Sequence, residues 1–148
     1  MTYATPADMI SAFSEAEIIE LSNLDYPDAT TINTEVVTRA IEDAQAQLDS
    51  YLETRYRTPL AVVPAVIRNY TCDVARYILD KDKPREEVTR RRDLVFYYLK
   101  DVAANKASLP GIQEGTNGSV GSGGTGVGDV VLFQSPGRVW TNETLGGW

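Results

Sequence analysis

The sequence predicts an all-α protein: a small antiparallel helical bundle of three longer and two short helices, followed by a Gly-rich linker and a C-terminal extended or β-hairpin arm. All 11 glycines lie at or beyond Gly111, and a glycine inside a helix costs roughly 1 kcal/mol relative to alanine. Pro6, Pro64 and Pro84 stand where candidate helices begin, a position that proline tolerates. Between these prolines, apolar residues recur at spacings of three and four, as on one face of a helix.

Two short helices are expected first. Thr5 can cap the first helix, with Pro6 at its first position and Asp8 three residues after the cap, and this helix ends near Phe13. Ser14 repeats the capping signal, with acidic residues in the turn that follows. The second short helix then runs into a polar loop that extends to Thr31.

Three longer helices follow. The first is predicted from Asn33 to Tyr56, about 23 residues, and is ended by Pro59. The second restarts at Pro64, and the third begins after Pro84 and closes before Pro110. Short connections between long helices favour antiparallel neighbours. The predicted buried stripes are Val37, Ala40, Ile41, Ala44, Leu48, Tyr51, Leu52 and Arg55, then Ile67, Tyr70, Val74, Ala75 and Ile78, then Val88, Val95, Tyr98, Leu99 and Val102.

The chain is expected to have three parts: a helical body at 1–110, a Gly-rich flexible linker at 111–129 and a docking arm at 130–148. The linker composition gives a typical reach of about 24 Å. In the arm, 130–133 and 138–140 are expected to form two short strands around a turn. Because an isolated pair of strands is marginally stable in water, the arm is expected to need a surface to dock on.

The composition argues against common catalytic chemistry. The chain has no histidine and one cysteine, so the usual zinc sites and the Ser-His and Cys-His nucleophile pairs cannot form. Asp43, Asp49 and Glu53 have spacings typical of solvated helix faces, and Cys72 is expected to be an inert core thiol. The glycine tract lacks the Gly-Lys-Ser or Gly-Lys-Thr ending of a phosphate-binding loop. We therefore expect no enzyme, no catalytic residue, no metal and no cofactor.

Charge and hydropathy restrict the partners. Up to Pro110 there are 13 basic and 18 acidic residues, a net charge of -5, and beyond it 1 and 3, a net charge of -2. Neither part has the basic excess of a protein that grips nucleic acid. No apolar run approaches the roughly 18 residues that span a bilayer, so no membrane contact is expected.

Ten residues are candidates for an interface with another subunit or a partner, because Tyr, Trp and Arg dominate protein interfaces. For the helical candidates an ordinary structural role stays open. Tyr51 and Tyr56 could lie in the core, with Arg55 bound to Asp49 or Asp73, and Asp73 could pair with Arg76. The arginine run could form surface pairs with Glu86, Glu87 and Asp93, or bind nucleic acid. The ten candidates are Tyr51, Arg55, Arg57, Arg90, Arg91, Arg92, Val131, Phe133, Arg138 and Trp140.

Four segments carry a family resemblance: 3–10, Ala44 through Leu60, Cys72 through Leu79, and Phe133 through Trp140. In these segments, which extend over nearly the whole chain, the sequence resembles Mu-like phage and prophage proteins of the head-to-tail connector class. The resemblance implies a structural virion protein that docks beneath the portal and forms a ring of about twelve copies around the DNA channel.

The same resemblance implies the partners and the place of action. Besides other copies of itself, the protein would contact the portal and a tail-side neck or terminator protein, while DNA passes through the lumen without specific binding. Excess negative charge suits such a channel. The protein would be assembled in the bacterial host cytoplasm and reside in the virion neck. The alternative is a host or prophage regulatory helical protein that binds nucleic acid through Arg90, Arg91 and Arg92.

Overall fold

The structure, a computed structural model, describes residues 2–80, 84–112 and 115, and every element in that part of the chain is a helix. The chain divides into two units, 1–118 and 119–148, and the described residues belong to the first. The all-α prediction is confirmed, whereas the arm predicted at 130–148 lies outside the described residues. The helices are α1 (Pro6–Phe13), α2 (Glu15–Ser22), α3 (Thr34–Leu52), α4 (Ala65–Leu79) and α5 (Glu86–Ala103).

The two short helices begin at the predicted caps. Thr5 accepts a hydrogen bond from the Asp8 N–H and the Asp8 carboxylate accepts one from the Thr5 N–H, which completes a capping box. Ser14 ends α1 and caps α2, and its side chain accepts from the Glu17 N–H. Ser14 has a φ of 101°, so the backbone leaves the helical conformation between α1 and α2.

The third helix is shorter than predicted, because α3 ends at Leu52 and not at Tyr56. Tyr56 is 1% exposed, and its hydroxyl accepts a hydrogen bond of 2.9 Å from the Leu109 N–H. Leu60 is also buried. The buried positions after Leu52 therefore continue the apolar pattern without continuing the helix, since tertiary contacts draw the chain into the core.

The two helices that follow start one or two residues later than their prolines suggest. Pro64 is the extended residue before α4, so Ala65 is the first helical position. The start of α5 lies after Arg85, whose N–H donates to the Asp80 carboxylate at 3.2 Å. Acidic side chains occupy the first turn of α5, where they interact favourably with the helix dipole.

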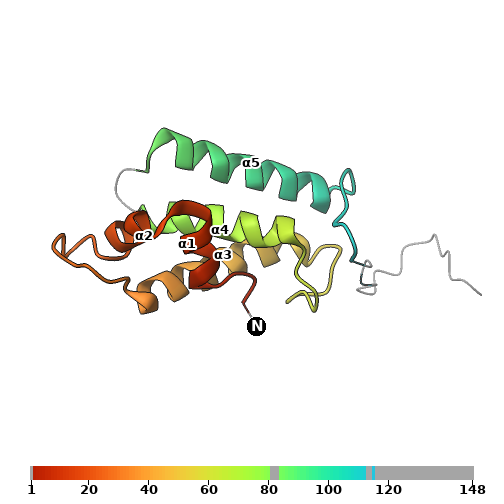
Figure 1. Cartoon of the computed structure of the whole chain (residues 1–148). Coiled ribbons are helices and arrows are strands. Elements are labelled where there is room, and N and C mark those ends of the chain that lie inside the picture. The colour runs from red at the N-terminus through yellow and green to blue at the C-terminus, as the bar shows by residue number, and fades with distance from the viewer. Residues whose placement is uncertain (1, 81–83, 113–114, 116–148) are drawn as a thin grey trace, which may run out of the picture. The chain divides into compact units, whose positions relative to one another are not determined.

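The long helices form an antiparallel bundle. In Figure 1, α3 and α5 run in one direction and α4 runs between them in the other, while α1 and α2 cover one end. α4 packs against both α3 and α5, and α3 also contacts α5 directly. The principal helical residues of the core, each at most 3% exposed, are Met9, Ile18, Val37, Ala40, Ile41, Ala44, Leu48, Leu52, Ile67, Cys72, Val74, Ala75, Leu79, Val95, Leu99 and Val102.

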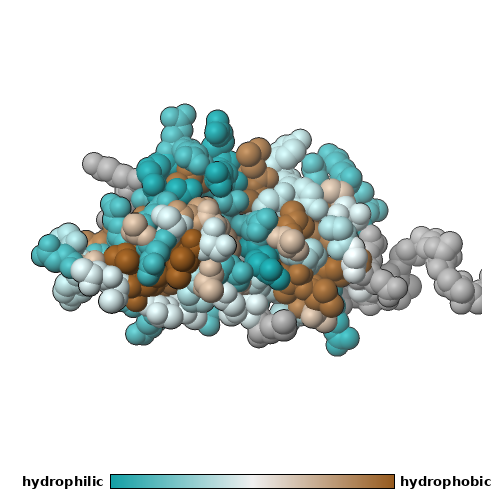
Figure 2. Space-filling view, viewed as in Figure 1, coloured by the Kyte–Doolittle hydropathy of each residue, from teal (hydrophilic) through white to brown (hydrophobic). Residues whose placement is uncertain are grey.

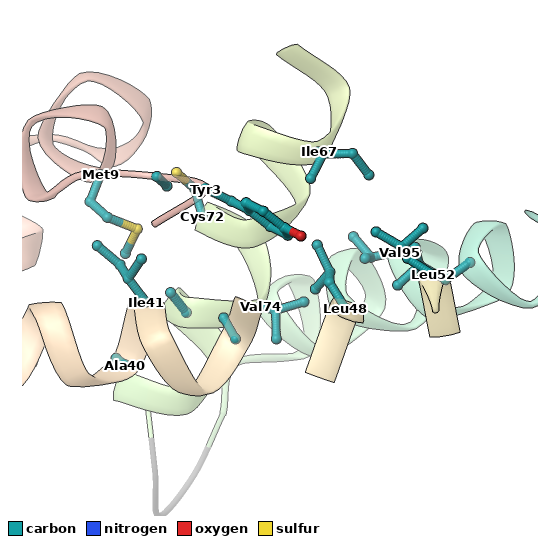
Figure 3. Packing of buried hydrophobic residues seen from close by; sticks show 14 of the residues in the cluster. Tyr3, Met9, Ala40, Ile41, Leu48, Leu52, Ile67, Cys72, Val74 and Val95 are labelled. Atoms are coloured by element: carbon teal, nitrogen blue, oxygen red, sulfur yellow. The ribbon is translucent and has the colours of Figure 1, made fainter. Parts of the chain in front are cut away.

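Tyr3 anchors the N-terminal segment in this core. Figure 3 shows the Tyr3 ring among side chains of α3 and α4, and the residue is 2% exposed. Its hydroxyl donates to the Asp49 carboxylate and accepts the Leu60 N–H at 2.8 Å, while its own N–H donates to Gln45 Oε1 at 3.0 Å. Burial and the bond to Asp49 raise the pKa of Tyr3. Residues before α1 thus join α3 to the loop that precedes α4.

Candidate protein interface

A surface groove lies between the C-terminal part of α3 and the middle of α5. It has a volume of about 520 Å³. Its centre is aromatic: the Tyr51 and Phe96 rings are 5.5 Å apart, and the Arg92 guanidinium lies 5.0 Å from the centre of the Phe96 ring. The groove is lined by Gln47, Ser50, Tyr51, Arg92, Asp93, Phe96, Tyr97 and Lys100.

A second, shallower groove of about 600 Å³ continues from the first along the outside of α5. The two share Asp93 and Tyr97. Leu94 is 63% exposed and Tyr97 is 68% exposed, and Arg90 lies one helical turn before Leu94. Figure 2 shows hydrophobic groups standing among hydrophilic ones over α5. We call the two grooves together the α5 outer surface; the second is lined by Glu86, Thr89, Arg90, Asp93, Leu94 and Tyr97.

Three of the predicted interface residues come together in this surface, namely Tyr51 from α3 and Arg90 and Arg92 from α5. Arg92 is held in place by a 2.9 Å ion pair with Asp93 and by the Tyr77 ring, whose centre lies 4.8 Å from the guanidinium. Such stacking fixes the position of the cation while leaving its edge available for a partner.

The other predicted arginines lie elsewhere. Arg91 forms the i,i+4 pair with Glu87 at 3.2 Å that the sequence suggested, and it also lies 3.6 Å from Asp73 of α4. Arg57 is exposed, and its backbone runs close to Gly115, since a Cβ on Gly115 would lie 3.1 Å from the Arg57 nitrogen. The remaining candidates, Val131, Phe133, Arg138 and Trp140, lie outside the described residues.

Arg55 has a structural role different from the one considered above. Its guanidinium donates to the carbonyl oxygens of Val102 at 2.8 Å and Ala107 at 2.7 Å. These carbonyls lie at the end of α5 and just beyond it, where the regular helical hydrogen bonds stop; the Val102 carbonyl also accepts from the Asn105 N–H at 3.1 Å. Asp49 instead accepts from Tyr3, and Asp73 lies beside Arg91. The prediction of an Arg55 ion pair with Asp49 or Asp73 is wrong, because Arg55 stabilises the C-terminus of α5.

A partly buried ion cluster joins α2, α4 and the residue before α5. Arg76, 7% exposed, donates to Glu17 at 2.7 Å, and Arg85 donates to the same oxygen at 2.5 Å. The Arg76 guanidinium also lies 4.6 Å from the centre of the Phe13 ring. Burial alone would raise the pKa of Glu17, but the bonds from Arg85 and Arg76 outweigh it and hold that pKa below 4.5.

This cluster corrects the predicted Asp73–Arg76 pair. Arg76 is bound by Glu17 of α2, and the carboxylate of Asp73 lies near Arg91 of α5. Burial raises the pKa of Asp73 while Arg91 opposes that shift. The three-residue spacing on α4 favoured a pair between Asp73 and Arg76. Each of them instead interacts with a residue of another helix, Glu17 of α2 or Arg91 of α5.

A second exposed surface, missed by the sequence analysis, lies on the connection between α2 and α3. Tyr26 is 74% exposed and Leu24 is 50% exposed, beside a hollow of about 460 Å³ lined by residues from 16 to 29. Asp25 and Asp28 are exposed in the same segment. We call this the acidic loop surface. The presence of Leu24 and Tyr26 in a loop rich in polar residues was the sequence signal from which it could have been predicted.

Cys72 is buried on α4, as predicted, and burial raises its thiol pKa to about 12. Within the described residues, no three His, Cys, Asp or Glu side chains are grouped so as to hold a metal ion. None of the described helices is both long enough and apolar enough to cross a membrane.

The fold and the α5 outer surface define a small helical-bundle protein that displays aromatic and arginine side chains of the kind found in protein interfaces. The family model described as Bacteriophage Mu, Gp36 matches residues 3–125, and the chain therefore belongs to this phage protein family. The resemblance to Mu-like phage and prophage proteins that the sequence indicated is confirmed.

Two curated relatives extend the match over almost the full length. The Mu-like prophage FluMu protein gp36 of Haemophilus influenzae is 29% identical over 146 residues, which cover 99% of this chain and 97% of the relative. Gene product J of Escherichia phage Mu is also 29% identical over 146 residues, covering 99% of both chains. Similarity therefore includes the region beyond the bundle.

Proposed function

We propose that this protein is a structural component of the virion, a head-to-tail connector or adaptor that docks under the portal and forms a ring around the DNA channel. The observation that carries the proposal is the α5 outer surface of a phage-family protein, where Leu94 and Tyr97 are exposed beside the Tyr51, Phe96 and Arg92 groove. A single bundle has no internal need for this second apolar stripe.

The proposed partners are other copies of this chain in a ring of about twelve, the portal, and a tail-side neck or terminator protein. The site of action is the neck of the virion after assembly in the bacterial cytoplasm. The net charge of -7 would discourage packaged DNA from adhering to the ring. In this role the protein is not an enzyme, and its working residues are those that bind other proteins.

The C-terminal arm contributes a second contact in this proposal. Residues 130–140 contain Val131, Phe133 and Trp140 together with Arg138, which combine apolar area with a cation. As predicted from its composition, the preceding Gly-rich segment would let these residues reach a neighbour, the portal or the next tail-side component. The ordering entropy of such an arm would delay docking until a partner is present.

The test is complementation in the phage or prophage that encodes the chain. With the gene deleted, we expect DNA-filled heads that lack tails, and the full chain should restore tailed particles. A chain lacking 130–148 should stay helical by circular dichroism and fail to enter capsids. Tailed, infectious particles in the absence of the gene would contradict the connector function, and normal assembly with the truncated chain would contradict the role of the arm.

The nucleic-acid alternative is tested separately. Arg91 and Arg92, two of the three arginines in the run, are already paired with carboxylates within the chain, so the run is a weaker phosphate site than three unpaired cations would be. We expect no binding of the full chain to duplex DNA even at low salt. Binding that weakens steeply as salt rises would favour the regulatory alternative.

A further inference from the structure

The acidic loop surface and the Tyr51 groove of the α5 outer surface lie toward opposite ends of the described bundle. In Figure 1 the connection between α2 and α3 projects at the end where α5 begins, whereas α5 runs toward the other end. The Tyr51 groove is formed by the last turns of α3 and by residues of α5 from its middle to Lys100. A loop at one end therefore cannot fill the groove of its own chain, and each surface is available to a second molecule.

The surfaces also differ in charge. No lysine or arginine precedes Arg39, and the acidic loop surface carries Glu20, Asp25 and Asp28. The α5 outer surface presents Arg90, Arg92 and Lys100 against Glu86 and Asp93. Opposite excess charge on two apolar surfaces favours contact between them and disfavours contact of either surface with itself.

The chemistry of the side chains is complementary too. Tyr26, 74% exposed, is a large aromatic with a polar tip, and the groove offers aromatic walls with Arg92 and Lys100 at its margin. Leu24 adds an apolar group next to Tyr26, and Leu94 supplies one beside the groove. Tyrosine and arginine are enriched among the residues that contribute most of the binding energy in protein interfaces.

We propose that the acidic loop surface of one copy docks on the α5 outer surface of a second copy. The inference rests on the proposed connector function and specifies the contact between neighbouring subunits. Because the two surfaces are different, each contact leaves one surface of each kind free. The contact therefore repeats from subunit to subunit, and in the proposed connector the rotation at each contact closes the series into a ring.

Disulfide trapping tests this contact with the full chain. Tyr26→Cys and Tyr97→Cys are made in separate preparations, one isotopically labelled, and are mixed at high concentration with a mild oxidant. Cys72 can stay, because it is 2% exposed and its pKa is about 12. We expect the mixed 26–97 dimer to exceed both the 26–26 and the 97–97 dimers, and a chain with both substitutions to give a ladder of oligomers. Absence of the mixed dimer, or a statistical ratio of the three products, overturns the proposal.

Val62→Cys is the matched control, since Val62 is a 70% exposed apolar residue outside both surfaces. Paired with Tyr97→Cys, it should give only the statistical yield, and an excess equal to that of Tyr26→Cys overturns the proposal. Tyr97→Cys captured chiefly by a cysteine introduced at Trp140, with no 26–97 product, would show that the arm occupies the groove and would also overturn it.

Charge reversal tests the electrostatic part. Asp25→Arg with Asp28→Arg on the loop, or Arg90→Glu with Lys100→Glu on α5, should each reduce the mixed 26–97 product, and the two sets combined in trans should restore it. All four positions are exposed, so the fold is expected to persist. Equal yields in all combinations, or no recovery in the combined case, contradict the charge pairing.

The trapping experiment and the complementation experiment can fail independently of each other. If the 26–97 product is absent while the protein is still required for tail attachment, the subunit contact is wrong and the connector function stands. If the product forms but phage assemble normally without the gene, the contact is right and the connector function is wrong.

Discussion

The inner and outer faces of α5 carry similar residue types and lie in opposite environments. Inner residues Val88, Val95, Leu99 and Val102 are at most 1% exposed, whereas Leu94 and Tyr97 on the outer face are 63% and 68% exposed. One apolar stripe suffices to pack a helix on its bundle. The inner face therefore explains why α5 folds against α3 and α4, and the outer face is explained by contact with another protein.

The largest expected difference comes from truncating one leucine on each face. Leu99→Ala should lower the free energy of unfolding by about 3 kcal/mol, since it leaves a cavity in the core. Leu94→Ala should change that free energy by less than about 0.5 kcal/mol. Urea denaturation of the two variants measures both values. Similar losses of unfolding free energy in the two variants would contradict the proposed difference between the inner and outer faces of α5.

The second expected effect concerns how α5 is joined to the N-terminal helices. Glu17→Gln removes the partner of the buried Arg76 and of Arg85, and should cost about 2 to 3 kcal/mol. Glu87→Gln, the matched control, breaks only the surface pair with Arg91 and should cost about 0.3 kcal/mol. Equal unfolding free energies for the two variants would show that the Glu17 cluster does not stabilise the bundle.

The pH dependence of that difference follows from the lowered pKa of Glu17. Burial acts to raise this pKa, but the bonds from Arg85 and Arg76 prevail, so the folded value lies below the ordinary 4.5. The stabilisation by Glu17 is then complete above the unfolded value and is lost as the pH falls through the folded value. The gap between wild type and Glu17→Gln should be constant near neutral pH and shrink below about pH 4.5. A gap that widened on acidification would contradict the assignment.

A smaller effect is expected where the chain leaves the bundle. Gly111 has a φ of +76°, and a Cβ there would meet no atom within 4 Å. Gly111→Ala should therefore destabilise through backbone strain alone, by about 1 kcal/mol. Ser108→Ala, at a nearby exposed position without positive φ, is the control and should be neutral. Thermal denaturation distinguishes the two, and no difference would show that this turn is free to relax.

The helices were largely predictable from the sequence because their signals are local. The Thr5 capping box, the Ser14 cap and the prolines before α4 and α5 act within a few residues. The end of α3 was not predictable in this way. Tyr56 keeps the apolar spacing of the helix, yet its burial and its bond to Leu109 depend on residues far along the chain.

The sequence predicted which types of residue lie in the candidate interface better than it predicted which residues they contact. Tyr51 and Arg92 were candidates because of their chemistry, and the packing of α3 on α5 brings them to one groove. The ordinary pairings considered for two other arginines, Arg55 with Asp49 or Asp73 and Arg76 with Asp73, are not formed, because Arg55 binds carbonyls at the end of α5 and Arg76 binds Glu17 of α2. Tyr26 was missed because a loop gives no periodicity from which to judge exposure.

The central claim, that the α5 outer surface serves assembly and not folding, is tested most directly by Leu94→Ser combined with Tyr97→Ser. Both residues are exposed, so the unfolding free energy should stay within about 0.5 kcal/mol of wild type. In complementation of the gene deletion, the variant should yield no more tailed infectious particles than the deletion itself. A variant that is as stable as wild type and restores wild-type titres would contradict the account.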